Sequence, residues 1–446
     1  MKNLINFGKK IFPICRSITG HGTLKTLKEI RKNHLKNLKI KKISCGKKVF
    51  DWKIPSEWNI KDAYVLDKNK KKIIDFKINN LHIVNYSTYQ NKKIKKKELL
   101  SKLNYIKNYP NAIPYITSYY KKNWGFCVTK KQYDKISRDY KNADQFLIKI
   151  SSSFKKKGSL NYGELIIPGK SKKEILISTY VCHPSMANNE LSGPLLSIAL
   201  AKYFKNKKKL SKSLRFIFIP ETIGSISYIN TNFSKIKNIL FGFVLTCVGD
   251  DKKFSMLTSK YNDTIVDKLC SEAYKKMGFK VKKYSFLERG SDERQFSSPG
   301  VDLPMISMMR SKYNTYKEYH TSRDNFDFVS AEGLKKSFKI HKYVLNKLIK
   351  MNEKKIYLGK IKNYVPKKKN PISLKTCEPN LGKRGLYHLL GTPSNQTLES
   401  SEANILDFLQ YSDGSNQIKQ ISKYINLSLK KTNKLYYFLK KKNLVK

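Results

Sequence analysis

Four short polar segments contain the residues that could do chemistry in this chain. They are YVCHPSMANNELSG (180–193), PETIGS (220–225), ERGSDERQF (288–296) and YHTSRDNFDF (319–328). Their side chains are imidazoles, carboxylates and amides. Neutral imidazole nitrogens and carboxylates are common zinc ligands, and a spare glutamate can take a proton from metal-bound water. These segments therefore predict the site of a metal-dependent hydrolase.

Apolar runs that alternate with amphipathic segments predict the elements that must position these residues. The predicted strands are FLIKISSS (146–153), GELIIPG (163–169), EILIST (174–179), LRFIFIP (214–220), FGFVLTCVG (241–249) and LPMISMM (303–309). The predicted helices are GPLLSIALAKYFKN (193–206), IGSISYINTNF (223–233) and NDTIVDKLCSEAYKKMG (262–278). This pattern is typical of an α/β fold with a mostly parallel sheet and helices on both faces. We expect the polar segments to meet at the carboxyl ends of its strands.

The rest of the chain completes a four-part organisation. Residues 1–45 have helical spacing and form the N-terminal helical part of the α/β domain, which continues over residues 113–360. Between them, residues 46–112 hold short runs separated by Pro, Asn and Asp, which predict an inserted small β-rich domain. After a Pro/Lys linker, residues 370–446 have the helical outline of a winged helix.

The basic charge of the chain does not predict specific nucleic-acid binding. The 446 residues carry a formal net charge of +58, but only nine of the 91 basic residues are arginine. Lys, Asn, Ile and Tyr are all abundant and have AT-rich codons, so genome composition explains the charge better than phosphate recognition does. Salt-sensitive, nonspecific adhesion to polyanions is still expected.

Cysteine usage and hydropathy indicate the compartment. The seven cysteines are scattered without a CxxC spacing, which is typical of reduced thiols. No apolar run approaches the roughly 20 residues of a membrane span, and the N-terminus has no export signal. We therefore expect a cytoplasmic protein without a membrane contact.

The order of the polar residues is similar to that of a known enzyme family. CHPSMANNELSG, IPETIGS, GSDERQF and EYHTSRDNFDF resemble the co-catalytic zinc aminopeptidases. More closely, they resemble bacterial polysaccharide-biosynthesis proteins with an aminopeptidase-like domain. FPICRSITGHG, the VFDW and NNLHIVNYS segments and the C-terminal region resemble the same family. The resemblance thus covers nearly the whole chain and implies an aminopeptidase-like fold.

The resemblance also implies roles for individual residues. In the aminopeptidases, two zinc ions share a bridging aspartate, and each also takes one histidine and one carboxylate. His183 and His320 match the two histidines, and Glu221 matches the general base. Neutral residues, however, match the three expected anionic ligands. They are Asn188 or Asn189 for the bridging aspartate, and Thr222 and Thr246 for the other two.

These departures predict one zinc ion rather than two, because two dications about 3.5–4 Å apart need bridging negative charge. His183 and His320 would hold the ion, with Glu190 as the preferred third ligand and Asp292 or Glu293 as the alternatives. Asp324 is expected to orient His320 from behind. The candidates for substrate binding or for support of the ligands are Asn188, Asn189, Asp292, Glu293, Arg294 and Asp324.

Each of these residues also has a structural interpretation. A histidine at a strand end can be a hydrogen-bonded structural residue, and Glu221 can cap the next helix. The Asn-Asn pair can form a turn, and residues 292–294 can be a solvated loop. A nucleophilic pair of Cys182 and His183 is not predicted, because adjacent side chains on a strand point apart.

Three functional hypotheses follow. The first is a zinc-dependent hydrolase that cleaves an amide bond in a small peptide or an amino-sugar conjugate, with a link to surface polysaccharide biosynthesis. The second is a catalytically inactive protein that binds a glycan precursor or a protein partner, for which Thr222 and Thr246 argue. The third is a DNA-binding regulator that acts through its C-terminal domain. That domain is alternatively a contact site for a protein partner or for a second copy of the chain.

Overall fold

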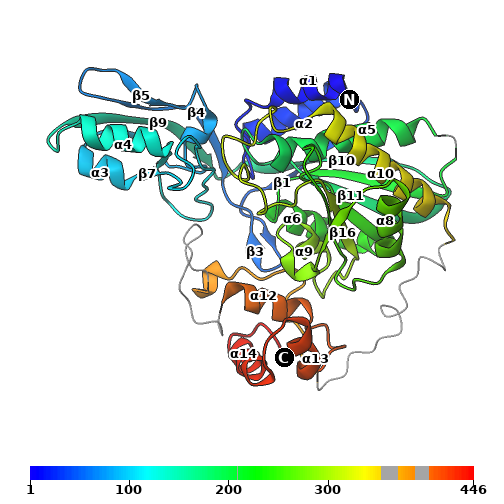
Figure 1. The fold of residues 1–446 in the computed structure, drawn as a ribbon. Coiled ribbons are helices and arrows are strands. Elements are labelled where there is room, and N and C mark those ends of the chain that lie inside the picture. Colours follow the sequence, from blue (N-terminus) through cyan, green and yellow to red (C-terminus); the bar gives the residue numbers. More distant parts are fainter. Residues whose placement is uncertain (208, 353–369, 387–400) are drawn as a thin grey trace.

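A large mixed sheet organises the molecule (Figure 1). The computed structural model describes the chain except residues 208, 353–369 and 387–400. The sheet has eight strands in the order β1-β10-β12-β11-β13-β16-β14-β15. Neighbouring strands are parallel from β12 to β16 and between β14 and β15, and antiparallel in the other three pairs. The predicted α/β class with a mostly parallel sheet is therefore confirmed, although the strands of this sheet are mixed in direction.

The bounds of these strands explain where the polar segments begin. The strands are β1 (Lys39–Ser44), β10 (Ser159–Ile167), β11 (Ser171–Tyr180), β12 (Lys212–Ile219), β13 (Ile239–Val244), β14 (Phe254–Leu257), β15 (Val281–Tyr284) and β16 (Met305–Met309). His183, Glu221 and Thr246 follow the carboxyl ends of β11, β12 and β13, which are parallel neighbours. Parallel strands that end at one edge bring the three loops together.

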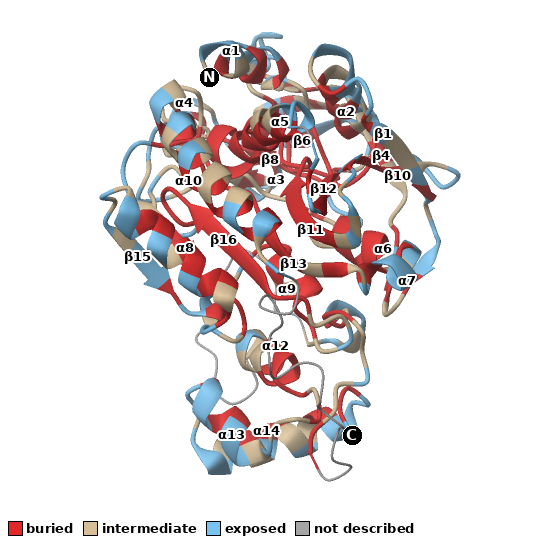
Figure 2. Ribbon diagram, turned by 90° about the vertical axis from the view of Figure 1, so that its right-hand side faces the viewer, coloured by how far each residue is buried: buried red, intermediate tan, exposed pale blue. Residues whose placement is uncertain are grey.

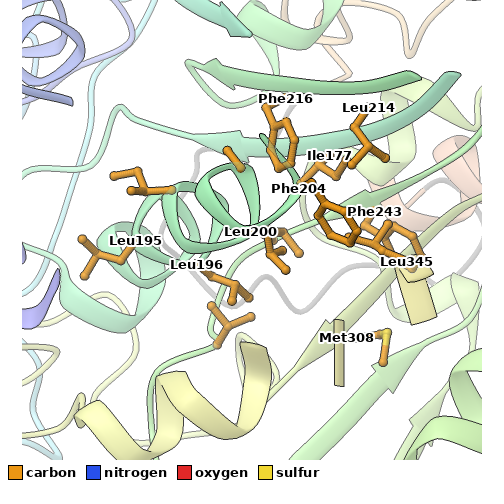
Figure 3. Packing of buried hydrophobic residues seen from close by; sticks show 14 of the residues in the cluster. Ile177, Leu195, Leu196, Leu200, Phe204, Leu214, Phe216, Phe243, Met308 and Leu345 are labelled. Atoms are coloured by element: carbon orange, nitrogen blue, oxygen red, sulfur yellow. The ribbon is translucent and has the colours of Figure 1, made fainter. Parts of the chain in front are cut away.

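The sheet is buried on both faces because consecutive apolar side chains of its strands point to opposite faces. In β11, Ile175 and Ile177 pack into one core and Leu176 packs into the other, as the two-residue period of a strand requires. Figure 3 shows side chains of α5, including Leu200 and Phe204, against residues of the sheet. Each face therefore needs its own cover.

Helices supply that cover. The helices that pack on the first face are α1 (Lys2–Ile11), α2 (His21–Asn33), α5 (Ser192–Lys205), α8 (Ile265–Lys276) and α10 (Ala331–Lys350). Those that pack on the second face are α6 (Ile223–Thr231), α7 (Phe233–Ile236) and α9 (Glu293–Phe296). Figure 2 shows the central strands as buried and the outer sides of α8 and α10 as exposed. A π-helical turn, Ala187–Leu191, precedes α5 and carries the two asparagines and Glu190.

A second, four-stranded sheet lies beside the large one (Figure 1). Its order is β5-β4-β9-β6, all antiparallel. Its strands are β4 (Glu57–Leu66), β5 (Lys72–Asp75), β6 (Gln90–Lys95) and β9 (Gln145–Lys155), and the helices beside it are α3 (Lys96–Ser101) and α4 (Lys130–Asp139). The strand predicted over residues 146–153 thus forms as β9, but it belongs to this sheet and not to the parallel one.

Short elements join these parts. They are the pairs β2 (Lys48–Val49) with β3 (Trp52–Lys53) and β7 (Leu103–Asn104) with β8 (Phe126–Cys127), and the 3-10 turns Asn80–His82, Phe286–Glu288 and Gly382–Arg384. None of the helices in the described part of the chain is long and apolar enough to cross a membrane.

Among its described residues, the C-terminal region has three α-helices, which lie below the large sheet in Figure 1. They are α12 (Glu402–Gln410), α13 (Ile418–Tyr424) and α14 (Leu429–Lys441). Isolated bridges join Ile372 to Asp413 and Ser373 to Val445. The helices share a core of their own around Ile405, Phe408 and Leu439. The helix-turn-helix-turn-helix pattern predicted for this region is therefore present.

Gly193 sets how closely the start of α5 approaches the sheet, and its substitution tests this packing. A Cβ there would lie 2.2 Å from the carbonyl oxygen of Leu245 and 2.3 Å from Thr179 Oγ1. We expect Gly193→Ala to lower the free energy of unfolding by about 3 kcal/mol, because the backbone must move apart. Urea denaturation followed by circular dichroism measures this.

Gly278→Ala is the matched control, because Gly278 has a φ of 68° but no atom within 4 Å of its added Cβ. It should cost about 1 kcal/mol through its left-handed backbone alone. Equal losses in the two variants would contradict the close packing of α5.

Candidate active site

Two histidines from distant parts of the chain lie side by side at the carboxyl edge of the sheet. The ring centroids of His183 and His320 are 5.4 Å apart, at an interplanar angle of 42°. The ring of Tyr115 contacts both, at 5.0 Å from His183 and 5.2 Å from His320. The loop that carries His320 is held in place because Tyr115 N donates to the His320 carbonyl oxygen. The imidazoles thus share one neighbourhood.

Uncharged groups surround His320. Its Nε2 lies 3.1 Å from Asn189 Oδ1, and Asn189 Nδ2 donates to the Tyr180 hydroxyl at 2.7 Å. That hydroxyl also lies 2.5 Å from Thr246 Oγ1. Burial lowers the pKa of His320 well below its usual value, and the nearby His183 lowers it further. The ring is therefore neutral near pH 7, with one N–H and one nitrogen lone pair, and Nε2 carries the hydrogen while it donates to Asn189 Oδ1.

Glu221 faces His183 from the loop after β12. Its Oε2 lies 3.7 Å from His183 Nε2, and its Oε1 accepts a 2.6 Å hydrogen bond from Ser291 Oγ. The side chain is 22% exposed, so water reaches the carboxylate. It does not cap α6, whose N-cap residue is Thr222, at a φ of 60°, without a side-chain cap bond. A carboxylate beside an imidazole and open to water is suited to moving a proton.

Glu190 lies on the other side of His183 and is held by a buried arginine. Arg16 Nε is 2.5 Å from Glu190 Oε1, and both side chains are fully buried. Glu190 Oε2 accepts hydrogen bonds from the backbone N–H groups of Cys182 and His183. The same Arg16 Nε donates to the His183 carbonyl oxygen. Oε2 is thus held by two N–H groups and Oε1 faces the guanidinium of Arg16. Glu190 also belongs to a group of possible metal ligands, so its role as third ligand stays a prediction.

Asp324 supports the asparagine turn rather than His320. Its carboxylate accepts hydrogen bonds from the backbone N–H groups of Asn188 and Asn189, at 2.6 and 2.9 Å, and from the Tyr316 hydroxyl. Burial raises its pKa to about 6. We expected it to orient His320, and the bonds show that it orients the turn that carries Asn189 instead. Asn188 in turn donates to Asp250 Oδ2.

Asp292 and Glu293 lie behind Glu221 and are engaged there. Asp292 Oδ1 accepts from Thr222 N and Ser225 Oγ, both at 2.7 Å. Glu293 Oε1 accepts from Gly290 N and Ser291 N and from the Tyr313 hydroxyl. Burial raises the pKa of Asp292 to about 8, and the charge of Glu221 adds to the rise. These carboxylates therefore shape the loop around Glu221.

Cys182 contacts His183, contrary to the expectation that the two side chains point apart. Its Sγ lies 3.4 Å from His183 Nδ1. With Glu190 they form a group of three possible metal ligands within 4.8 Å of one another. Burial raises the pKa of this thiol well above its usual value, and Glu190 and Glu221 raise it further. In the absence of a metal ion the thiol therefore keeps its proton, and the Glu190 carboxylate is paired with Arg16.

The donors in front of the two rings are of types that a zinc ion accepts. His183 Nε2 lies 3.7 Å from Glu221 Oε2, His320 Nε2 lies 3.1 Å from Asn189 Oδ1, and the two ring centroids are 5.4 Å apart. Thr222 and Thr246 bring no negative charge to this site. Two imidazoles with one carboxylate match the ligand chemistry of zinc.

Several residues of the site were not predicted from the sequence. Arg16, Tyr115, Tyr180, Asp250 and Ser291 all contact the predicted residues. Arg16 lies in FPICRSITGHG, a segment quoted for its family resemblance alone. A buried ion pair between residues so far apart leaves no local pattern in either segment.

Comparison with known proteins agrees with this architecture. Residues 5–352 match the family model described as a domain of unknown function, DUF4910, and residues 370–446 match a winged helix-turn-helix model. The chain is 42% identical over 419 residues to a curated protein of Clostridium acetobutylicum, which is named as a candidate polysaccharide biosynthesis protein with an aminopeptidase-like domain. That match covers 94% of this chain and 90% of the relative.

Solved structures share the fold. A candidate peptidase from Clostridium acetobutylicum is 38% identical and superposes with a TM-score of 0.75, over 100% of this chain and 96% of that one. A zinc aminopeptidase from Bacillus subtilis is 14% identical, with a TM-score of 0.58, over 79% of this chain and 96% of that one. At that identity, the second likeness concerns the fold alone.

The buried pair of Arg16 and Glu190 gives a stability prediction. We expect Arg16→Met to lower the free energy of unfolding by about 3–5 kcal/mol, because it leaves a buried carboxylate without its counter-charge. Adding Glu190→Gln should recover at least half of the loss. Guanidinium chloride titrations of the single and double variants measure both values, and additive losses would contradict the pairing.

The raised pKa of Asp292 gives a pH prediction. Its buried neutral form stabilises the fold fully below the usual carboxyl pKa near 4, and this contribution is lost as pH rises through about 8. Asp292→Asn keeps an oxygen acceptor for Thr222 and Ser225 but cannot ionise. We expect the Tm of the wild type to fall more than that of Asp292→Asn between pH 5 and pH 9. Parallel thermal profiles would contradict the buried acid.

Proposed function

We propose that this chain, which belongs to the DUF4910 family of proteins with an aminopeptidase-like domain, is a zinc-dependent hydrolase of amide bonds. The observation that supports the proposal most strongly is that the ring centroids of His183 and His320 are 5.4 Å apart, with Glu221 beside His183. Side chains of these types in one partly open site suit metal-assisted hydrolysis.

His183 and His320 would hold the ion, and Asn189 Oδ1 is a neutral oxygen beside His320 Nε2. When bound, zinc polarises the substrate carbonyl and lowers the pKa of water. We propose one ion rather than two. Asn189, Thr222 and Thr246 are neutral, and Arg16 already balances the charge of Glu190.

Glu221 is the proposed general base. It takes a proton from the attacking water, whose oxygen bonds to the carbonyl carbon. It then gives that proton to the amide nitrogen as the C–N bond breaks, which releases an acid and an amine. Ser291 holds one oxygen of Glu221 and leaves the other toward His183. Asp324 and Tyr180 keep Asn189 in place beside His320.

The proposed substrate is a small peptide or an amino-sugar conjugate. The zinc aminopeptidase that shares the fold is named for peptide cleavage, and the relative at 42% identity is named for polysaccharide biosynthesis. Both substrates contain an amide bond, so the same catalytic residues serve either one.

Metal content tests this function directly. Purified protein, dialysed and analysed by mass spectrometry for metals, should retain about one zinc ion per chain. His183→Ala and His320→Ala should each remove most of it, since each deletes one ligand. The control is His21→Ala, an exposed histidine outside the site. Full zinc in both site variants would rule out these ligands.

Glu221→Gln separates the base from the metal. We expect this variant to keep its zinc and to lose at least about 100-fold in amide hydrolysis, since a general base contributes about 10²–10⁴-fold. Hydrolysis of a panel of aminoacyl 4-nitroanilides and dipeptides measures the rate. Loss of zinc in this variant, or an unchanged rate, would contradict the role of Glu221. Stoichiometric zinc without hydrolysis of any amide would favour a binding protein.

A further inference from the structure

The C-terminal winged-helix region packs against the loop that carries Ser291 and Asp292. Arg289 Nη1 donates to Asp407 Oδ1 at 2.6 Å, and Gln410 Nε2 donates to the carbonyl oxygen of Arg294 at 2.8 Å. Figure 1 shows α12 directly below α9, the short helix that follows this loop. The docked region therefore touches a segment of the candidate active site.

Glu378 is the centre of this contact. It precedes α12 and is 7% exposed. Its Oε2 lies 3.5 Å from Arg294 Nε and accepts a 2.8 Å hydrogen bond from Gln295 Nε2. Its Oε1 lies 3.9 Å from Arg289 Nη2, and its carbonyl oxygen accepts from Trp52 Nε1. A carboxylate held from so many sides is a rigid counter-charge for Arg294.

Arg294 extends from this contact to the site. Its Nη2 donates to Thr222 Oγ1 at 2.8 Å, and Thr222 follows Glu221 in the chain. The backbone N–H of Thr222 also donates a hydrogen bond to the carboxylate of Asp292. The Arg294 side chain is 24% exposed, so it is accessible at the edge of the site. Glu378 lies beside the Nε edge of the guanidinium, and Thr222 accepts a hydrogen bond from its Nη2.

A guanidinium fixed in this way is suited to bind an anion. Arginine pairs with carboxylates through parallel hydrogen bonds, and it binds more tightly when its orientation is set in advance. The carboxylate that faces it directly is Glu378 from the C-terminal region. Glu378 is a direct partner, so its loss changes the orientation of Arg294 without removing its charge.

We propose that Arg294 binds a carboxylate of the substrate near the scissile amide, and that Glu378 of the C-terminal region positions Arg294 for this contact. The proposal rests on the function proposed above and adds its substrate class, amides that carry a free carboxylate. It also assigns the winged-helix region a part in the active site. Glu378 is a positioning residue, because it acts through Arg294.

A matched pair of dipeptides tests this. Glycyl-leucine and glycyl-leucinamide differ only in the free carboxylate. Their affinities are measured by isothermal titration calorimetry with zinc-loaded protein carrying Glu221→Gln, which prevents turnover. We expect about tenfold tighter binding of glycyl-leucine, as one charge-assisted contact provides. Adding Arg294→Gln should reduce this preference to less than twofold, and Glu378→Gln should reduce it partly.

Two control variants separate the orientation of Arg294 from the loss of one positive charge and from a weakened contact of the C-terminal region. Arg323→Gln removes one exposed arginine from the loop of His320. Asp51→Asn breaks ion pairs with Lys383 and Arg384 elsewhere on the C-terminal contact. Both should keep the tenfold preference, and Arg294→Lys should restore part of it.

The outcomes are distinct. A preference that persists in Arg294→Gln overturns the proposal, and so does a zinc-loaded protein that shows no preference or binds neither dipeptide. A preference lost equally in Asp51→Asn and Glu378→Gln overturns the positioning role of Glu378. Zinc content, measured on the same samples, reports separately on the proposed function.

Discussion

The position of His183 depends on one buried carboxylate. Glu190 accepts hydrogen bonds from the backbone N–H groups of Cys182 and His183. Its charge is balanced by Arg16, whose side chain also donates to the carbonyl oxygen of His183. An unpaired carboxylate in such a place would cost several kcal/mol. The N-terminal segment, the end of β11 and the turn before α5 therefore form one unit, and the imidazole of His183 is fixed by it.

The same principle of balanced buried charge explains the rest of the site. Asp324 is tied to two backbone N–H groups, and Glu293 to two more and a tyrosine hydroxyl. The groups that contact His320 and its neighbour Asn189 are mostly hydroxyls and amides. Glu221 is the acid that remains partly exposed beside an imidazole. Most of these carboxylates thus hold loops in place, and Glu221 is left beside His183.

Local pattern predicted the elements that position the site, and it could not predict the contacts between distant segments. The apolar runs of β11 and β12 placed His183 and Glu221 at adjacent strand ends, because parallel strands end at one edge. The composition of the run at 146–153 suits a strand of either sheet, so the sequence did not indicate which strands it pairs with. His320 has a left-handed φ of 52°, and the carboxylate of Asp324 binds the asparagine turn, neither of which a local pattern indicates. The contact between Arg16 and Glu190 joins two distant segments and leaves no local trace.

The proposed function depends on two imidazoles that bind the same metal ion. X-ray absorption at the zinc edge of the zinc-loaded protein tests it most directly, because it reports the atoms bound to the ion. We predict two imidazole nitrogens at about 2.0–2.1 Å with lighter oxygen ligands, no sulfur and no second metal. A zinc–sulfur distance near 2.3 Å, which would place the ion beside Cys182, or a spectrum without imidazole scattering, would contradict the account.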